Sequence, residues 1–482
     1  MPVTLSALHD DERRRLTAAL VVLLAAAAFA WTAGANDLGL KTFDDCRYAR
    51  KGLEMMQRGG FMEVTWAGRP DFPYPPLQFW LIGRAMAVFG PGDFAARFPS
   101  MVMALGTMAA VVWIGALTLG RRAGLTAAAL LALTPMFGNH ARRCMIDLPL
   151  CFWTALVVLV FLLGLRHRRL HALIALPLAA ALLTKGMLGL LGLFLLPAAV
   201  VSARLRPALR SGWLWVGVAA GVLIGASWPV HHAIVFGSAF VDDHFGATIF
   251  RRVLGQAALP RSSANPLALL WKEYQPLVVP AAAGLGLWLW RRRRAGAAES
   301  DALAAWVAAP IALLALSHWS SGRYLFAVLP ALALFAGDAL VRLARPVASA
   351  IALWLAPVLL VACGVTYLVS PETLKNYGNM PYKGFAAEAR ALMPSGALVP
   401  SIGDPGVGHW ETENVALWYW GVVAETPRPP AEAVARALST NHRALLVQRD
   451  RLEGLDSLGV KYEVPFMSRF GLVVLADVGG TR

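Results

Sequence analysis

Two adjacent carboxylates follow the first apolar stretch of the chain, in the segment KTFDDCRYARKGLEMMQRGGF that runs from Lys41 to Phe61. Residues three and four apart share one face of a helix, so Asp44 lies on the same face as Arg47 and Tyr48. Asp45 lies about 100° away from Asp44 in a helix of 3.6 residues per turn. Acidic and basic groups on one face suit general acid–base chemistry, but the pattern also fits a helix with a hydrated face.

Ionisable side chains also interrupt other apolar stretches, where a charge is costly in a membrane. They occur in NHARRCMIDLP, LLTKGML and SHWSSGRYLF, and in the loop from Asp242 to Arg252. Simpler explanations compete with a site: Asp147 fits an ordinary helix start, and Lys185 fits a side chain that reaches the membrane interface. Arg142 and Arg143 fit contacts with lipid headgroups.

One further group has the residue types of a metal site: His231, His232, His244, Asp242 and Asp243. Histidines near an interface are more often simply interfacial, so no metal ligand is assigned. Asp338 lies near the cytoplasmic end of its apolar stretch, and we expect it to face water.

The composition places the chain in a membrane. Of its 482 residues, 57% are hydrophobic and only 15% are charged, and the mean hydropathy of +0.56 is too high for a soluble protein of this size. Apolar stretches of the length that a spanning helix needs, about 20 residues, recur from Leu16 to Ser370. We predict a polytopic α-helical membrane protein with about 11–13 transmembrane helices.

The net charge of +15 is mainly a sign of topology rather than of nucleic-acid binding. Arginines gather between apolar stretches on alternate sides, at positions 13–15, 121–122, 166–169, 204–210, 291–294 and 342–345. The positive-inside rule makes these segments cytoplasmic, which places the N-terminus inside and the loop with Asp44 outside. Residues 16–35 also have features of a signal peptide, but their length and the charge alternation favour a retained helix.

The four cysteines, Cys46, Cys144, Cys151 and Cys363, do not have the spacing of metal ligands. Cys46 and Cys144 are both expected on the outer side, where a disulfide is the alternative to two free buried thiols.

Two regions are predicted. Residues 1–370 form the transmembrane domain, and its large first outer loop, 37–93, contains amphipathic helices interrupted by RPDFPYPP, because paired prolines cannot continue a helix. Residues 371–482 are more polar and predict a small α/β domain outside the membrane. This domain combines a helical pattern at 431–438 with strand-like stretches at 397–402, 444–448 and 471–475.

The order of these motifs resembles the GT-C glycosyltransferases, most of all the lipid A aminoarabinose transferases and the related protein O-mannosyltransferases. The resemblance runs from the first helix to the tenth and rests on DDCRYARKGLEMMQRGGF, PYPPLQFWL, RRCMIDLPLCFW, LLTKGMLGLL and GRYLFAVLPALALFAG. The motifs D-x-x-R-Y, the double proline, M-x-D-x-P and T-K-G are specific together, whereas each alone is weak.

The resemblance implies an enzyme that moves a sugar from a polyprenyl-phosphate donor to a hydroxyl or phosphate of lipid A, lipopolysaccharide or another surface glycan. It implies inversion at the sugar, and an active site on the periplasmic face of the bacterial inner membrane. By position, Asp44 and Asp147 match the catalytic carboxylates. The residues that match substrate-binding positions are Arg47, Tyr48, Tyr74, Arg143, Lys185, Arg251, Arg252, Arg323 and Tyr324.

The chain departs from the aminoarabinose transferases in one motif. Those enzymes carry E-K-P-P, whereas Pro73 and Tyr74 precede Pro75 and Pro76 here. Because a carboxylate and a lysine are missing, we predict no family-like metal site, although a divalent cation stays compatible with the rest. The alternative functions are a protein O-glycosyltransferase of the same fold and a transporter of lipid-linked sugars, which the lack of an internal repeat disfavours.

The charge pattern gives a testable topology. A reporter fused after Arg482 is expected to be active in the periplasm, and one fused within residues 291–295 is expected to be active in the cytoplasm, because the Arg291 to Arg294 run is retained inside. Alkaline phosphatase activity and green fluorescence report the two sides. The reverse result at either position would overturn the orientation.

Overall fold

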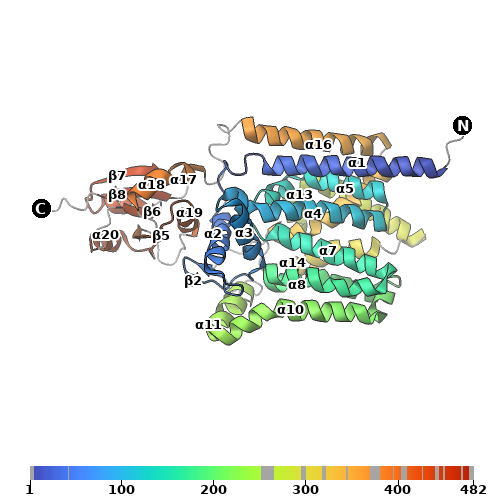
Figure 1. The fold of residues 1–482 in the computed structure, drawn as a ribbon, viewed down its shortest axis with the longest axis horizontal. Helices are drawn as coiled ribbons and strands as arrows, with labels where there is room; N and C mark the ends of the chain where they lie inside the picture. The colour runs from blue at the N-terminus through green and yellow to red at the C-terminus, as the bar shows by residue number, and fades with distance from the viewer. Residues whose placement is uncertain are drawn as a thin grey trace.

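Long apolar helices packed side by side form the main body of the protein, and a smaller α/β region lies at one end of them (Figure 1). The fold is a computed structural model. It describes residues 5–476 with the exception of Thr42, 251–264, 295–299, 317–321, 344–345, 370–379, 394–395, 403–409, Thr426, 440–443, 449–450 and 468–470.

The α-helices of the bundle follow the apolar stretches of the sequence. They are α1 (Leu5–Thr32), α4 (Asp93–Thr118), α5 (Arg121–Leu133), α7 (Asp147–Arg166), α8 (Ala175–Lys185), α9 (Leu195–Val201), α10 (Gly212–Phe236), α13 (Pro266–Arg294), α14 (Ser300–Leu316), α15 (Leu329–Leu343) and α16 (Pro346–Val369). Tighter 3₁₀ segments join some of them: η1 (Arg168–Ile174), η2 (Gly186–Phe194), η3 (Arg206–Arg210) and η5 (Gly322–Val328).

Six helical stretches among the described residues are long and apolar enough to cross a membrane: 14–32, 93–118, 147–166, 168–201, 212–236 and 322–343. Shorter apolar helices, including α14 and α16, lie beside them. The chain is thus a polytopic helical membrane protein, and the predicted total of about 11–13 spans stays a prediction.

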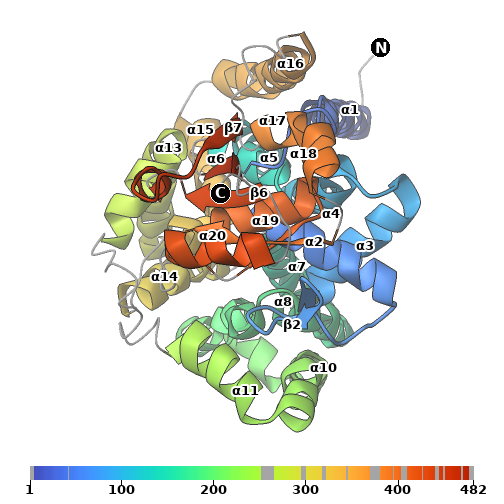
Figure 2. The same ribbon diagram turned by 90° about the vertical axis from the view of Figure 1, so that its left-hand side faces the viewer.

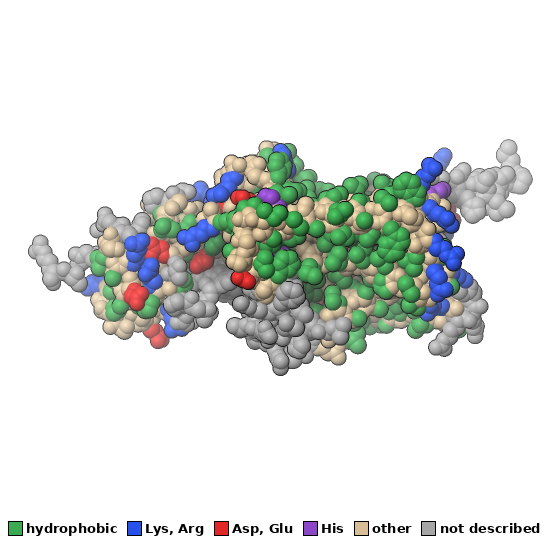
Figure 3. Space-filling view, turned by 90° about the horizontal axis from the view of Figure 1, so that it is seen from below, with side chains coloured by type: hydrophobic (Ala, Val, Ile, Leu, Met, Phe, Trp, Pro, Cys, Tyr) green, Lys and Arg blue, Asp and Glu red, His purple; other side chains and the backbone are tan. Residues whose placement is uncertain are grey.

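The two ends of the bundle differ in charge. Lysine and arginine side chains gather at the end where the N-terminus lies, and an apolar surface covers the length between the ends (Figure 3). We call this end the basic end. The opposite end, called the domain end, carries α2 (Phe43–Arg58), α3 (Leu77–Phe89) and the C-terminal α/β region (Figures 1 and 2). One apolar belt between a basic end and a mixed end is the surface that the positive-inside pattern predicts.

The predicted first outer loop forms two helices that cross closely. Between them lies a short antiparallel hairpin, β1 (Thr65–Trp66) with β2 (Arg69–Pro70). A Cβ atom added to Gly52 of α2 would lie 2.3 Å from the Ile82 side chain of α3, and one added to Gly83 would lie 2.8 Å from the Gly52 carbonyl oxygen. The crossing therefore requires glycine on both helices.

A buried charged triad holds α2 against the segment that follows the hairpin. The carboxylate of Asp71 forms ion pairs with both Arg47 and Lys51, and Lys51 is fully buried. Burial favours the neutral acid in Asp71, but the charges of Lys51 and Arg47 outweigh it and lower the pKa of Asp71. Burial lowers the pKa of Lys51 to about 8, with Asp71 opposing, so the triad is charged at neutral pH.

The C-terminal region contains a four-stranded mixed sheet in the order β4, β6, β8, β7. Its strands are β4 (Ser401–Ile402), β6 (Ala444–Gln448), β7 (Tyr462–Met467) and β8 (Gly471–Ala476), and a separate parallel pair joins β3 (Leu398–Val399) to β5 (Val423–Ala424). The helices of this region are α17 (Met380–Gly384), α18 (Ala386–Leu392), α19 (Trp410–Tyr419), α20 (Pro430–Ser439) and α21 (Glu453–Asp456). The predicted helix and strand stretches are present, whereas β7 and α19 escaped the sequence patterns.

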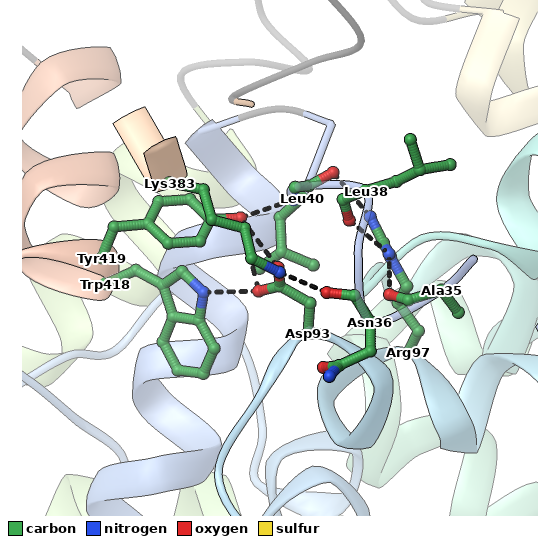
Figure 4. A network of polar contacts seen from close by, with 10 residues as sticks. Ala35, Asn36, Leu38, Leu40, Asp93, Arg97, Lys383, Trp418 and Tyr419 are labelled. Atoms are coloured by element: carbon green, nitrogen blue, oxygen red, sulfur yellow. Dashed lines mark hydrogen bonds and ion pairs between the residues drawn. The ribbon is translucent and has the colours of Figure 1, made fainter. Parts of the chain in front are cut away.

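A polar network at Asp93, the first residue of α4, ties this region to the bundle (Figure 4). The Asp93 carboxylate accepts from Lys383 at 2.9 Å, from the Trp418 indole at 2.9 Å and from the Tyr419 hydroxyl at 3.2 Å. The same hydroxyl accepts from the Leu40 backbone N–H at 2.6 Å. The network thus connects α19 to the segment between α1 and α2.

Arg97, one turn further along α4, holds the other side of that connection. Its guanidinium, 1% exposed, donates to the carbonyls of Ala35, Leu38 and Gly39. These three carbonyls belong to the segment between α1 and α2, so Arg97 fixes this segment and the start of α2 relative to the bundle.

Neutralising Asp71 is expected to destabilise the protein. Asp71→Asn keeps the shape of the side chain but leaves Lys51 and Arg47 without a counter-charge, which costs about 3–5 kcal/mol for a broken buried pair. Thermal unfolding of the purified chain measures the loss. The control is Asp242→Asn, which makes the same substitution at an exposed aspartate. It is expected to shift the free energy of unfolding by less than about 0.5 kcal/mol. Equal unfolding temperatures for the two variants would contradict a structural triad.

The Asp93 network predicts a second contrast. Tyr419→Phe removes one donor to Asp93 and one acceptor for Leu40, and each buried group left unpaired costs about 1–3 kcal/mol. The matched control is Tyr462→Phe, because the Tyr462 hydroxyl donates to Asp456 on an exposed surface. Limited proteolysis should release the C-terminal region faster in Tyr419→Phe only, and equal cleavage rates would show that this hydroxyl does not hold it.

Candidate active site

Asp147 and Lys185 form a buried pair at the domain end. Lys185 Nζ lies 2.5 Å from Asp147 Oδ1, and the two side chains are 6% and 4% exposed. Asp147 is the first residue of α7, but its side chain makes no capping hydrogen bond there. The helix start predicted at Asp147 is present, but the carboxylate pairs with Lys185 instead of capping α7, and Lys185 is buried in this pair rather than extended to the interface.

A tight turn places Lys185 at this point. The helix α8 ends at Lys185, and Gly186 has a φ of 60°, a left-handed conformation that glycine adopts at little cost. The segment η2 then returns along α8, because a Cβ on Gly189 would lie 2.4 Å from the Leu182 backbone nitrogen. The T-K-G motif thus builds a reversal whose tip carries the lysine.

Asp44 and Arg323 form a second pair that is more accessible. Arg323 Nη1 lies 3.1 Å from Asp44 Oδ2, and the two side chains are 44% and 23% exposed. Asp44 comes from the first turn of α2, and Arg323 is the second residue of the 3₁₀ segment η5 that precedes α15. The next residue, Tyr324, presents its ring to Lys185 at 5.2 Å, so η5 touches both pairs.

Tyr48 shows that the two carboxylates share one neighbourhood. Burial raises the pKa of Tyr48 well above its ordinary value, and the nearby Tyr74, Asp44 and Asp147 raise it further. Its ring packs edge-on against Tyr74 with centroids 5.8 Å apart. The segments that carry residues 44, 74, 147, 185 and 323 therefore meet at one site at the domain end.

An aromatic wall with a buried cation closes the α2 side of this place. Lys51 Nζ lies 5.6 Å from the Tyr48 ring, 5.9 Å from the Tyr74 ring and 5.0 Å from the Phe79 ring. A cation within about 6 Å of a ring face is attracted to it, so Lys51 helps to hold both tyrosines in place. Sequence reasoning missed Lys51 and Asp71, although Lys51 lies three residues after Tyr48 on the same helical face.

Two of the predicted binding residues are committed to other partners. Arg47 turns to Asp71 and lies over the Trp66 ring at 5.6 Å. Arg143 Nε lies 3.2 Å from Asp45, which is fully buried. Headgroup contact alone is therefore wrong for Arg143, and also for Arg142, which donates to the carbonyls of Ala30 and Ala33. Arg251 and Arg252 lie outside the described residues.

The histidines pack with aromatic rings beside this place. His244 belongs to a π-helical segment, η4 (Val241–Phe250), which follows α11 (Ser238–Phe240), and its Nδ1–H donates to the Phe72 carbonyl at 2.9 Å. A Cβ on Gly186 would lie 3.7 Å from the His244 ring and 3.9 Å from Pro75. Within the described part of the chain, no three His, Cys, Asp or Glu side chains are grouped to hold a metal ion. Pro73 and Tyr74 offer no carboxylate, so the residues at this position do not fit a family-like metal site.

The structure also tests the predictions for Asp338 and for the cysteines. Asp338 does not face water: it is fully buried and pairs with Arg291 of α13 and, at 2.6 Å, with Arg342, which lies one turn further along the same helix, α15. Cys46 and Cys144 are buried thiols and do not form a disulfide. The short helix α6 (Pro135–Ala141) leads from α5 to this region, and Asn139 of α6 accepts from Lys41 at 3.0 Å.

Comparisons with known proteins agree with this architecture. A family profile described as dolichyl-phosphate-mannose-protein mannosyltransferase matches residues 73–231. The undecaprenyl phosphate-alpha-4-amino-4-deoxy-L-arabinose arabinosyl transferase of Pseudomonas savastanoi pv. phaseolicola is 28% identical over 312 residues, which are 63% of this chain and 58% of that protein. Transferase 1 of the same name from Pseudomonas fluorescens is 30% identical over 326 residues, again 63% of this chain and 56% of that protein. The alignments thus span little more than half the length of these relatives.

Solved structures extend the likeness to the whole fold. ArnT from Cupriavidus metallidurans, bound to undecaprenyl phosphate, matches with a TM-score of 0.74 at 19% identity, over 96% of this chain and 99% of that one. The archaeal oligosaccharyltransferase AglB from Archaeoglobus fulgidus, in complex with an inhibitory peptide and a dolichol-phosphate, matches with a TM-score of 0.57 at 14% identity, over 94% of this chain and 74% of that one. The chain therefore has the fold of these membrane transferases and is similar in sequence to the aminoarabinose transferases.

Proposed function

We propose that this protein is an inverting glycosyltransferase that moves a sugar from a polyprenyl-phosphate donor to a hydroxyl or phosphate of lipid A or another surface glycan. The reaction takes place at the domain end, which we place on the periplasmic side of the bacterial inner membrane. The donor class is supported by the names of the similar transferases and by the undecaprenyl phosphate bound to ArnT.

One observation carries the proposal: two carboxylates and two cations from four separate segments meet at one end of an apolar bundle. Asp44 pairs with Arg323, and Asp147 pairs with Lys185. Such residues are costly beside a membrane and need a role, and a sugar transfer needs both kinds. A base must accept the acceptor proton, and cations must stabilise the leaving phosphate.

The accessibility of the two carboxylates assigns their roles. Asp44 is 23% exposed and Asp147 only 4%, so Asp44 is the group that an acceptor hydroxyl reaches. The acceptor oxygen attacks the anomeric carbon, the bond from that carbon to the phosphate oxygen breaks, and the hydroxyl proton passes to Asp44. Asp147 holds Lys185 in place by their ion pair.

The leaving polyprenyl phosphate gains negative charge as the bond breaks. Lys185 and Arg323 are the described cations nearest the two carboxylates, and charge-assisted hydrogen bonds from such groups are about twice as strong as neutral ones. Tyr74 and Tyr324 border these cations and shape the space for the sugar. Arg251 and Arg252 keep the donor-binding role that their sequence positions imply.

The acceptor class has a second candidate, because the matching family profile is named for a protein mannosyltransferase. A protein O-glycosyltransferase would use the same base and the same donor phosphate site. Mass spectrometry of lipid A and of secreted proteins from a strain without this chain separates the two. Loss of a sugar from lipid A supports the glycolipid acceptor, whereas loss from serine or threonine side chains assigns a protein acceptor.

Asp44→Asn tests the base directly. Asparagine keeps the shape and the capping ability of the side chain but cannot take up the hydroxyl proton, so the rate should fall roughly 10²-fold or more. The fold should survive, because partly exposed ion pairs contribute only about 0–1 kcal/mol. Single-turnover transfer from a polyprenyl-phosphate sugar, with donor binding measured in parallel, gives the rate.

The control for this variant is Asp37→Asn, an exposed aspartate in the same loop. Asp45→Asn is unsuitable, because it would leave Arg143 buried without its partner. If Asp44→Asn turned over at the wild-type rate with intact donor binding, the base would move to Asp147.

A further inference from the structure

A cavity lies at the edge of the bundle, apart from the carboxylate pairs. It has a volume of about 610 Å³ and lies between α1, α5, α6, α13 and α16. Its lining includes Trp31, Lys41, Arg142, Glu273, Leu360 and Tyr367, and it includes none of Asp44, Asp147, Lys185 and Tyr324. Pockets of about 300–1,000 Å³ are the size that binds small molecules and cofactors.

The cavity runs along the membrane-facing helix α16. Tyr367 lies near the end of α16, and Leu360 and Leu359 lie seven and eight residues deeper, which is about 10 Å along a helix. Leu359 and Cys363 are exposed on the outside of the helices, and α16 and α1 lie together at the periphery of the bundle (Figure 2). The cavity therefore reaches from the interfacial end of α16 into the apolar belt.

The interfacial end of the cavity is positively charged. Lys41 Nζ donates to Asn139 at 3.0 Å, and the Arg142 guanidinium lies 3.9 Å from the Tyr367 ring centroid while it donates to backbone carbonyls. Among the described residues of the lining, Glu273 is the single carboxylate, beside the two cations Lys41 and Arg142. Carbonyl hydrogen bonds leave the charge of Arg142 in place, so an anionic group at this end is favoured.

The deep end of the cavity is apolar. Ala30, Trp31, Leu133, Leu359 and Leu360 line it. Close packing leaves few voids in protein interiors, and water gains no hydrogen bonds from such walls. The surrounding bilayer supplies hydrocarbon chains at this depth.

We propose that this cavity binds one anionic glycerophospholipid from the surrounding membrane leaflet. Its phosphate lies beside Lys41 and Arg142, and an acyl chain runs inward along Leu359 and Leu360. The lipid joins α16 and α1 to the bundle next to the active site, because Lys41 neighbours Asp45 and Glu273 packs against Gly322, the residue before Arg323. This inference is independent of the proposed transfer reaction.

Protection of Cys363 tests the proposal on the unmodified chain. Cys363 lines the cavity and is exposed, whereas the other three cysteines are buried. We expect phosphatidylglycerol, added to delipidated protein in detergent, to slow alkylation of Cys363 by N-ethylmaleimide at least fivefold, and phosphatidylethanolamine to have a much smaller effect. The same rate with and without phosphatidylglycerol would overturn the proposal.

Two further ligands distinguish other occupants. If inorganic phosphate protected Cys363 to the same extent as phosphatidylglycerol, the cavity would be a simple anion site. This result would overturn the proposal of a lipid. If undecaprenyl phosphate protected Cys363 at a lower concentration than phosphatidylglycerol, the cavity would be a donor site. This result would also overturn the proposal.

Native mass spectrometry of variants provides a second measurement. Leu360→Trp fills the apolar end and should weaken phosphatidylglycerol binding at least tenfold, whereas Val365→Trp, on the opposite side of α16, should leave it unchanged. Lys41→Gln should reduce the preference for phosphatidylglycerol over phosphatidylethanolamine. Wild-type binding by Leu360→Trp would show that the lipid lies elsewhere.

Discussion

Opposite charges buried in pairs hold the domain end of this protein together. Asp147 with Lys185, Asp45 with Arg143, and Asp71 with Lys51 and Arg47 each join segments that are separate along the chain. Removing a charge from water costs several kcal/mol, and a partner at hydrogen-bond distance is what makes the burial tolerable. Each pair therefore determines where its two segments lie, and the positions of the tyrosines and of the accessible carboxylate follow from them.

Asp44 and Arg323 differ from these buried pairs because their side chains are accessible to solvent. Their side chains are 23% and 44% exposed, so water screens their attraction and the pair is worth little to stability. In the proposed reaction, this pair separates to admit a phosphate and a hydroxyl, and the buried pairs behind it stay in place. A rigid set of buried pairs around one weak, exposed pair is a suitable arrangement for a site that must bind two substrates in turn.

The helix that carries Asp44 is supported on two sides. The Asp71 triad and the aromatic wall lie on one side of α2, and α19 of the C-terminal region packs on the other, where burial raises the pKa of Glu413. The Asp93 network fixes α19 to α4, and Arg97 fixes the chain between α1 and α2. The C-terminal region thus contributes to the position of Asp44 although it lies outside the bundle.

The sequence by itself determined much of this protein. Apolar length identified the membrane helices, arginine placement identified the basic end, and helical periodicity placed Asp44 and Asp45 on different faces. The paired prolines at 75–76 marked the interruption in the first outer loop. These features are local, because helix length, charge side and residue face depend on neighbours within a few turns.

Only the tertiary structure decided which charges pair. Asp147 and Lys185 looked like a helix cap and an interfacial lysine, and Asp338 looked exposed, until packing brought each to a partner. Lys51 and Asp71 carried no motif, and their importance lies in their burial among aromatic rings. Periodicity states which face a side chain takes, but its partner depends on how helices far apart in the chain pack, and no short stretch of sequence contains that information.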